Sequence, residues 1–173
     1  MLIIGLGNPG KAYARTYHNT GYLAVDFLTG GARFAATPLK QFLYFKKGGD
    51  VFVKPLTFMN DSGAAAKEAL KYFKMKPEEC AVVHDDSDIE LGAFKIAFAR
   101  GSAGHKGVES VIAHLGTNGF WRVRIGVRKR RGKAGDLVLK PIAPKDRVAL
   151  EEVFAQIGEK IKNDASKAKN VSV

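Results

Sequence analysis

Cysteine is nearly absent from the sequence, and long apolar runs are absent altogether. Cys80 is the single thiol among 173 residues, so no internal disulfide can form and a reducing compartment is indicated. A zinc site built mostly of cysteine is excluded for the same reason. No stretch approaches the roughly 18 apolar residues of a membrane helix, and the N-terminus lacks the basic start and long apolar core of a signal peptide. We therefore expect a cytoplasmic protein with no membrane partner.

Acidic residues are scarce as well. The chain has 17 Asp and Glu against 28 Lys and Arg, which gives a formal net charge of +11. The imbalance is concentrated between Glu109 and Asp136, where seven basic residues occur and no acid does. Such a charge indicates a polyanionic partner, although a basic surface that only maintains solubility would give the same composition.

Part of this charge falls on an alternating segment that predicts a strand. Val123 and Ile125 would enter the core, whereas Arg122 and Arg124 would project from one face and place guanidinium groups on phosphates. The basic residues of 128–133 predict an exposed loop, which either contacts RNA or is simply solvated.

The apolar pattern predicts one α/β domain over residues 1–173, with about the last ten residues frayed. Short apolar or alternating segments are interleaved with segments whose apolar residues recur every three or four positions. This is typical of a twisted, mixed and mostly parallel sheet with helices on both faces. Gly48 and Gly49 separate two strand-like segments and predict a hairpin. The expected strands are 1–4, 42–47, 50–54, 81–83, 94–98 and 121–127, and the expected helices are 21–28, 62–73, 108–115 and 150–161.

A glycine-rich loop follows the first expected strand. Gly5–Gly10 reads G-L-G-N-P-G and formally matches the dinucleotide motif GxGxxG. That site needs a helix that opens within the glycines and an acid at the end of the next strand. Here Pro9 and Gly10 predict a turn, and Asp26 falls in an expected helix, so a Rossmann site is rejected. Asn8 can still donate and accept hydrogen bonds to a ligand.

Further loops lie beside strand ends, where α/β sheets build their sites. His18 lies between the first loop and a helix start and is a candidate general base. Asn60 is either a helix cap or an amide that faces the same crevice as Asn8. The acids of 84–88 would bind a hard cation, stay solvated or orient a histidine. His105 begins a helix whose backbone N–H groups suit an anion.

No serine or cysteine stands out as a nucleophile. The sequence has no G-x-S-x-G motif, and Cys80 precedes an apolar strand. The residues therefore favour water activated by a histidine over covalent catalysis.

Taken together, these segments resemble the bacterial-type peptidyl-tRNA hydrolase family. The matching motifs are G-L-G-N-P-G at 5–10, Y-x-x-T-x-H-N at 13–19, K-P-x-T-F-M-N-x-S-G at 54–63, H-D-x-x-D at 84–88, G-H at 104–105 and R-x-R-I-G at 122–126. They occur in the family's order and spacing, and the set is highly specific. The resemblance implies a single α/β domain, acting as a monomer without metal or cofactor. It would cleave the ester between a peptide and the 3′ end of tRNA and so recycle the tRNA for translation.

The same resemblance implies roles for individual residues. His18 would be the general base, and Asp85 the partner that fixes its tautomer and stabilises the imidazolium. Asn60 would position the ester carbonyl or the water, and Asn8 would read the peptide. The residues implied to contact substrate or tRNA are Tyr13, Phe58, Met59, Asn60, Lys95, Gly104, His105, Lys106 and Arg124.

Three positions depart from the family pattern. Tyr17 precedes the histidine where the family commonly has arginine, and Lys106 stands where an asparagine contacts substrate. Ala97 replaces a second basic residue two positions after Lys95. We expect the chemistry to persist while substrate contacts are rearranged, with Lys106 and Arg100 meeting phosphate. The changes also leave open an alternative, a non-catalytic RNA-binding relative of the same fold.

Overall fold

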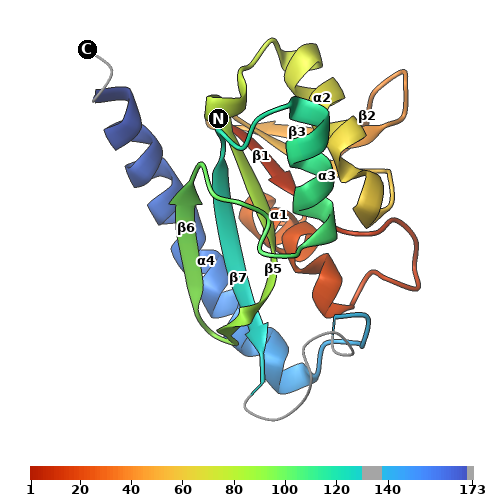
Figure 1. Cartoon of the computed structure of the whole chain (residues 1–173). Helices are drawn as coiled ribbons and strands as arrows, with labels where there is room; N and C mark the ends of the chain where they lie inside the picture. The colour runs from red at the N-terminus through yellow and green to blue at the C-terminus, as the bar shows by residue number, and fades with distance from the viewer. Residues whose placement is uncertain (130–137, 171–173) are drawn as a thin grey trace.

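The computed structural model describes residues 1–129 and 138–170, with side chains up to residue 160. The described residues form a seven-stranded sheet in the order β2-β3-β4-β1-β5-β7-β6 (Figure 1). The strands are β1 Leu2–Gly5, β2 Ala35–Ala36, β3 Phe42–Lys47, β4 Asp50–Pro55, β5 Cys80–Glu90, β6 Phe94–Phe98 and β7 Trp121–Arg128. The helices are α1 Thr20–Thr29, α2 Ser62–Phe73, α3 Lys106–Leu115 and α4 Pro144–Asn170, and the short 3-10 turns are η1 Tyr17–Asn19, η2 Met59–Asp61 and η3 Pro77–Glu79.

The centre of the sheet is parallel and its edges are antiparallel. Strands β4, β1, β5 and β7 run in the same direction. β6 joins β7 antiparallel at one edge, and β3 and β2 extend the other edge. The predicted hairpin between β3 and β4 turns through Gly48 and Gly49, whose φ angles of 61° and 86° favour glycine. The predicted mixed, mostly parallel α/β sheet is thus confirmed.

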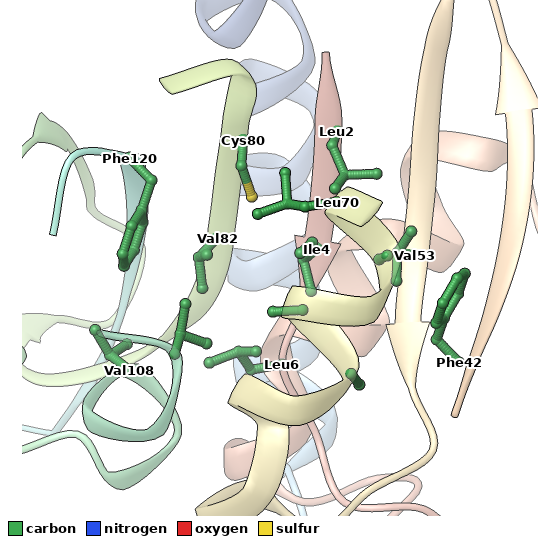
Figure 2. Close-up of a cluster of buried hydrophobic side chains, with 14 of the residues drawn as sticks. Leu2, Ile4, Leu6, Phe42, Val53, Leu70, Cys80, Val82, Val108 and Phe120 are labelled. Atoms are coloured by element: carbon green, nitrogen blue, oxygen red, sulfur yellow. The ribbon is translucent and has the colours of Figure 1, made fainter. Parts of the chain in front are cut away.

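Helices cover both faces of the sheet because apolar residues alternate along its strands. Leu2 and Ile4 of β1 pack with α2 and α3 in one apolar cluster, part of which Figure 2 shows. Ile3, between them, joins a second cluster on the other face, which α1 and α4 complete with residues such as Val25 and Phe154. The two clusters fix the strands of the parallel centre, so the loops at their carboxyl ends start from rigid positions.

β5 is longer than the sequence predicted. It continues past Val83 to Glu90, so Asp85 and Asp86 lie within a strand and not in a loop after it. A run of charged residues usually marks solvent exposure, but here both acids are buried and hydrogen-bonded to side chains of other segments. The prediction of a strand end at this point was therefore wrong.

The basic region also differs from its expected arrangement. Arg122 is only 1% exposed, so the prediction that it presents a guanidinium to phosphate was wrong. Arg128 ends β7, and residues 130–133 of the predicted basic loop lie outside the described residues. The C-terminal helix α4 extends well beyond the predicted apolar stripe on both sides. None of the described helices combines the length and apolarity needed to span a membrane.

Candidate active site

Two loops at the carboxyl ends of the parallel strands come together with β5. The loop after β1 carries Asn8, and η1 follows it with His18. The turn η2, which follows β4, carries Asn60. Asp85 lies on β5 two positions beyond Val83, the last residue that pairs with β1. The parallel topology therefore gathers residues from distant parts of the chain at one edge of the sheet.

His18 and Asp85 form the expected pair. The His18 Nδ1 atom lies 2.9 Å from Asp85 Oδ1 and 3.1 Å from Oδ2, so one imidazole nitrogen faces both carboxylate oxygens. The His18 side chain is 16% exposed and the Asp85 side chain 3%. Among the described residues, the His18 Nε2 atom has no hydrogen-bond partner, which leaves it available to a ligand or to water.

A second imidazole holds the same carboxylate. The His105 Nε2 atom lies 3.1 Å from Asp85 Oδ1. Its Nδ1 atom accepts a hydrogen bond from the Val108 backbone N–H at 3.2 Å, because His105 is the N-cap of α3. A nitrogen that accepts cannot carry the proton of a neutral ring, so His105 carries it on Nε2 and donates to Asp85. The sequence placed His105 among substrate contacts, and the structure adds this direct bond to Asp85.

Asp85 is ionised because its two histidine partners outweigh its burial. Desolvation alone would raise the pKa of the carboxyl, but hydrogen bonds from His105 and His18 hold that pKa well below its usual range. A carboxylate facing His18 Nδ1 keeps the proton on that nitrogen, and the lone pair of neutral His18 is then on Nε2. The pair thus presents a base at the open side of the imidazole.

Behind Asp85 lies a buried pair that the sequence did not predict. The His84 Nδ1 atom is 2.6 Å from the backbone carbonyl oxygen of Asp85. Arg122 donates to His84 Nε2 from Nε at 3.2 Å and lies 3.0 Å from it through Nη2. Burial, then His105 and Arg122, lower the pKa of His84 well below its ordinary value, so this ring is neutral.

Arg122 also connects this pair to the loop before α3. Its guanidinium donates to the backbone carbonyl oxygens of Gly101 and Ser102. Burial, then the neighbouring Arg124, lowers the pKa of Arg122 to about 10, so it remains a cation at neutral pH. The only sequence signal for this role was the position of Arg122 in an alternating strand. That position predicts a surface residue equally well.

Asn8 ties the first loop to both turns of the site. Its Oδ1 atom accepts from the Met59 backbone N–H at 2.7 Å. Its backbone N–H and carbonyl pair with the side-chain amide of Asn19 at 2.8 and 2.9 Å. Asn19 lies at the N-cap position of α1, yet its side chain makes no cap hydrogen bond there and holds Asn8 instead. Within the described residues, the Asn8 Nδ2 group donates to no protein atom and remains available to a ligand.

The glycines of the first loop serve helix packing more than ligand approach. A Cβ atom on Gly5 would lie 2.3 Å from the Gly21 carbonyl oxygen, so α1 crosses β1 at backbone contact. A Cβ atom on Gly7 would meet the ring of Tyr22 at 2.6 Å. The close approach that these glycines permit is therefore to α1, which begins at Thr20, directly after η1.

The segment around η2 divides into buried and exposed residues. Met59 is 5% exposed and belongs to the core cluster against α2 and α3, so the structure places it as a support and not as a surface contact. Phe58 is 56% exposed, and its ring forms a T-shaped pair with the Tyr13 ring at a centroid distance of 6.3 Å. Asn60 is exposed and makes no hydrogen bond with any described residue. Tyr13, Phe58 and Asn60 therefore offer an accessible surface beside the site.

The basic residues expected to contact tRNA differ in how far nearby carboxylates compensate their charge. Lys95 is exposed on β6, where it is the register partner of Arg124 on β7. Arg124 donates from Nε to Asp86 Oδ2 at 2.6 Å, so part of its charge is compensated. Lys106 lies at the first position of α3, after the exposed Gly104, and pairs with Glu109 at 3.0 Å.

His18, Asp85 and His105 have the spacing of a metal site, with one potential ligand atom from each within 4.8 Å of the others. The hydrogen-bond pattern disfavours such a site. The Val108 N–H fixes the His105 proton on Nε2, and a protonated nitrogen cannot coordinate a metal ion. The three side chains are already joined by hydrogen bonds. Of the roles considered for the acids of 84–88, Asp85 therefore has that of orienting a histidine.

Comparisons with known proteins give a consistent result. The family model described as peptidyl-tRNA hydrolase matches residues 2–171. A peptidyl-tRNA hydrolase of Aquifex aeolicus is 38% identical over 161 residues, which cover 88% of this chain and 83% of the relative. A peptidyl-tRNA hydrolase of Lactobacillus gasseri is 39% identical over 175 residues, covering 98% of this chain and 94% of the relative.

The fold agrees with a solved structure of the same kind. The crystal structure of peptidyl-tRNA hydrolase from Acinetobacter baumannii superimposes with a TM-score of 0.85 at 28% sequence identity. The match covers 98% of this chain and 90% of that chain.

Proposed function

Because the chain belongs to the peptidyl-tRNA hydrolase family, we propose that it hydrolyses the ester between a peptide and the 3′ end of tRNA. The observation that carries the chemistry is the His18–Asp85 pair, with an ionised carboxylate on Nδ1 and an open Nε2. The products are a peptide with a free carboxyl group and a tRNA that can be used again in translation.

His18 acts as the general base. Its Nε2 atom removes a proton from a water molecule as the water oxygen attacks the ester carbonyl carbon. Asp85 stabilises the imidazolium that forms. When the tetrahedral intermediate collapses, the bond from the carbonyl carbon to the 3′ oxygen breaks, and the imidazolium returns its proton to that oxygen. Each proton taken by His18 is given back, so the cycle returns the imidazole to its starting state.

The two asparagines position the substrate. Asn60 is exposed beside the site and has an uncommitted amide that can orient the ester carbonyl or the attacking water. Asn8 is held rigidly by Met59 and Asn19, and its Nδ2 group can donate to a peptide carbonyl. A free aminoacyl group lacks such a carbonyl, which gives a basis for discriminating against it.

The exposed residues around the site form the contact for tRNA. Tyr13 and Phe58 present ring faces to the unpaired end of the acceptor arm. The donors for phosphates are Lys95, Lys106 and Arg124, while Gly104 and His105 form the loop that leads to Lys106. We take residues 1–173 to be one domain that works as a monomer in the cytoplasm.

The test is release of tRNA from a peptidyl-tRNA by the wild type and by His18→Ala. Loss of a general base lowers a rate by about 10²–10⁴-fold, so kcat should fall by that range while RNA binding stays unchanged. His114→Ala, which removes an exposed histidine on α3, is the matched control and should retain full activity. A wild type that binds RNA but releases no tRNA would favour the non-catalytic alternative instead.

A further inference from the structure

Tyr17 precedes His18 directly, yet its side chain is buried against α4 and not in the site. The ring is fully buried. Its hydroxyl donates to Asp146 Oδ2 at 2.5 Å and accepts from the Ala143 backbone N–H at 3.3 Å. Asp146 lies in the first turn of α4 and is itself buried. One side chain of η1 is thus anchored to the start of the last helix.

A cation from a third segment completes this buried group. The Lys129 Nζ atom, one residue after β7, lies 2.6 Å from the same oxygen of Asp146. It also lies 5.0 Å from the centroid of the Tyr17 ring, within the range of a cation–π contact. Burial would raise the pKa of Asp146, but hydrogen bonds from Lys129 and Tyr17 keep it below its ordinary value. The group is therefore a charged pair with a neutral hydroxyl donor.

The backbone beside this group holds the segment that enters η1 and the first two residues of η1. Residues 138–142, which lead into α4, run along residues 15–18 with a bridge between Thr16 and Pro141. The joining backbone hydrogen bonds are Ile142 N–H to Arg15 O at 2.8 Å, Tyr17 N–H to Lys140 O at 3.2 Å, and His18 N–H to Val138 O at 2.7 Å. The backbone N–H of His18 is thereby held by Val138, while its side chain is held by Asp85.

We propose that Tyr17, Asp146 and Lys129 are positioning residues for His18. Asp85 orients the imidazole ring, and the buried group fixes the backbone that carries it by joining η1, the segment before α4 and the end of β7. A general base must stay within hydrogen-bond reach of the water it activates, and small displacements of reacting groups cost large factors in rate. The kinetic part of this inference rests on the proposed function, whereas the structural part does not.

The group also explains why tyrosine can stand where the family commonly has arginine. An arginine at position 17 would bring its own cation to the Asp146 carboxylate. Tyr17 supplies only a hydroxyl donor, and Lys129 supplies the positive charge that balances the buried acid. The two positions should therefore be exchangeable as a pair.

The kinetic test uses Tyr17→Phe and Lys129→Met, with tRNA release from peptidyl-tRNA as the assay. Each variant should lower kcat by about tenfold, well short of the loss expected for removing the base, and leave KM unchanged. Adding Tyr17→Arg to Lys129→Met should restore kcat. The matched control is Arg147→Met, which breaks an exposed ion pair with Glu151 on the same helix and should leave both constants unchanged.

A second measurement is independent of turnover. The His18 Nδ1–H proton that faces Asp85 can be followed by NMR and assigned by its loss in His18→Ala. Its exchange with solvent should be about tenfold faster in Tyr17→Phe and Lys129→Met, in line with the lost hydrogen bond to a charged group. Should Tyr17→Phe fail to fold, Lys129→Met, at a partly exposed position, carries the test.

The outcomes separate the two proposals. A wild type without tRNA release would contradict the proposed function, yet the exchange measurement would still test the positioning role. Unchanged exchange and unchanged kcat in both variants would overturn the positioning role. So would equal losses in Arg147→Met, because the effect would then be one of general stability.

Discussion

His84 is a buried histidine whose protonation state affects the stability of the folded protein. Its ring is fully buried, with Nδ1 against the Asp85 carbonyl and Nε2 against the guanidinium of Arg122. A proton on Nε2 would place two cations in contact in a dry environment. The neutral ring is therefore part of the fold, and it keeps both Asp85 and the loop before α3 in place.

This neutral histidine makes stability depend on pH. The pKa of His84 is lowered in the folded chain, so below about pH 6.5, the ordinary value, the unfolded chain binds the extra proton. Stability is complete above that pH and falls as the pH decreases, by up to about 1.4 kcal/mol per pH unit for one linked proton. Urea unfolding at pH 7 and pH 5 measures this slope.

The matched variants are His84→Gln and His114→Gln. His84→Gln should be less stable at pH 7, because a flexible amide replaces the buried imidazole ring held between the Asp85 carbonyl and Arg122, but its stability should fall less steeply toward pH 5. His114→Gln alters an exposed histidine and should retain the wild-type slope. An equal slope in the wild type and in His84→Gln would show that this ring does not carry the pH dependence.

At the scale of elements, the junction between η1 and α1 controls the position of His18. A Cβ atom on Gly21 would lie 2.3 Å from the Val83 carbonyl oxygen and 2.5 Å from the backbone nitrogen of Leu6. Both neighbours are backbone atoms of β5 and of the loop after β1, and neither can move aside alone. The first turn of α1 thus rests on the two segments that carry Asp85 and Asn8.

Gly21→Ala should therefore destabilise the protein even though alanine favours helices. The gain in helix propensity is about 1 kcal/mol, whereas overpacking against fixed backbone costs about 1–3 kcal/mol or more. Gly101→Ala is the control, since a Cβ atom there meets nothing within 4 Å. Chemical denaturation of both variants checks this, and a Gly21→Ala as stable as the wild type would contradict the close packing described for α1.

Apolar periodicity predicted the elements whose local sequence carries their structure. The β3–β4 hairpin and helices α1, α2 and α3 formed near their predicted positions. β5 did not, because Asp85 and Asp86 are stabilised by His18 and Arg124, which lie far away in the sequence. The pattern of residues along a short segment cannot reveal pairing with distant residues. The burial of Arg122 was missed for the same reason.

At the scale of the whole molecule, the parallel topology makes the site predictable even where single elements were misjudged. Loops after parallel strands meet at one edge of a sheet, so His18 and Asn60 could be grouped with Asn8 from their order alone. Their individual roles depended on contacts that only the folded chain reveals. Asn8 holds Met59, Asn19 holds Asn8, and His105 shares Asp85 with His18.

The net charge of +11 acts at the same scale, but not every basic residue can contribute to binding RNA. Arg122 is buried, and Arg124 shares its Nε–H with Asp86. No described residue accepts a hydrogen bond from the remaining nitrogens of Arg124, and its register partner Lys95 is exposed. Arg124 can therefore hold Asp86 and still donate to a phosphate.

Arg124→Ala should weaken tRNA binding and make it less sensitive to salt. A variant that neutralises one phosphate fewer than the wild type should have a slope of log K against log salt that is smaller by about 0.9 on duplex nucleic acid. Lys71→Ala, an exposed residue at the far end of α2 from η2, removes one unit of charge outside the proposed contact. It should leave the slope unchanged, which separates a direct contact from the general field of the protein. If the two variants change the slope equally, Arg124 adds only to the overall charge, and the phosphate contact must be assigned to other residues.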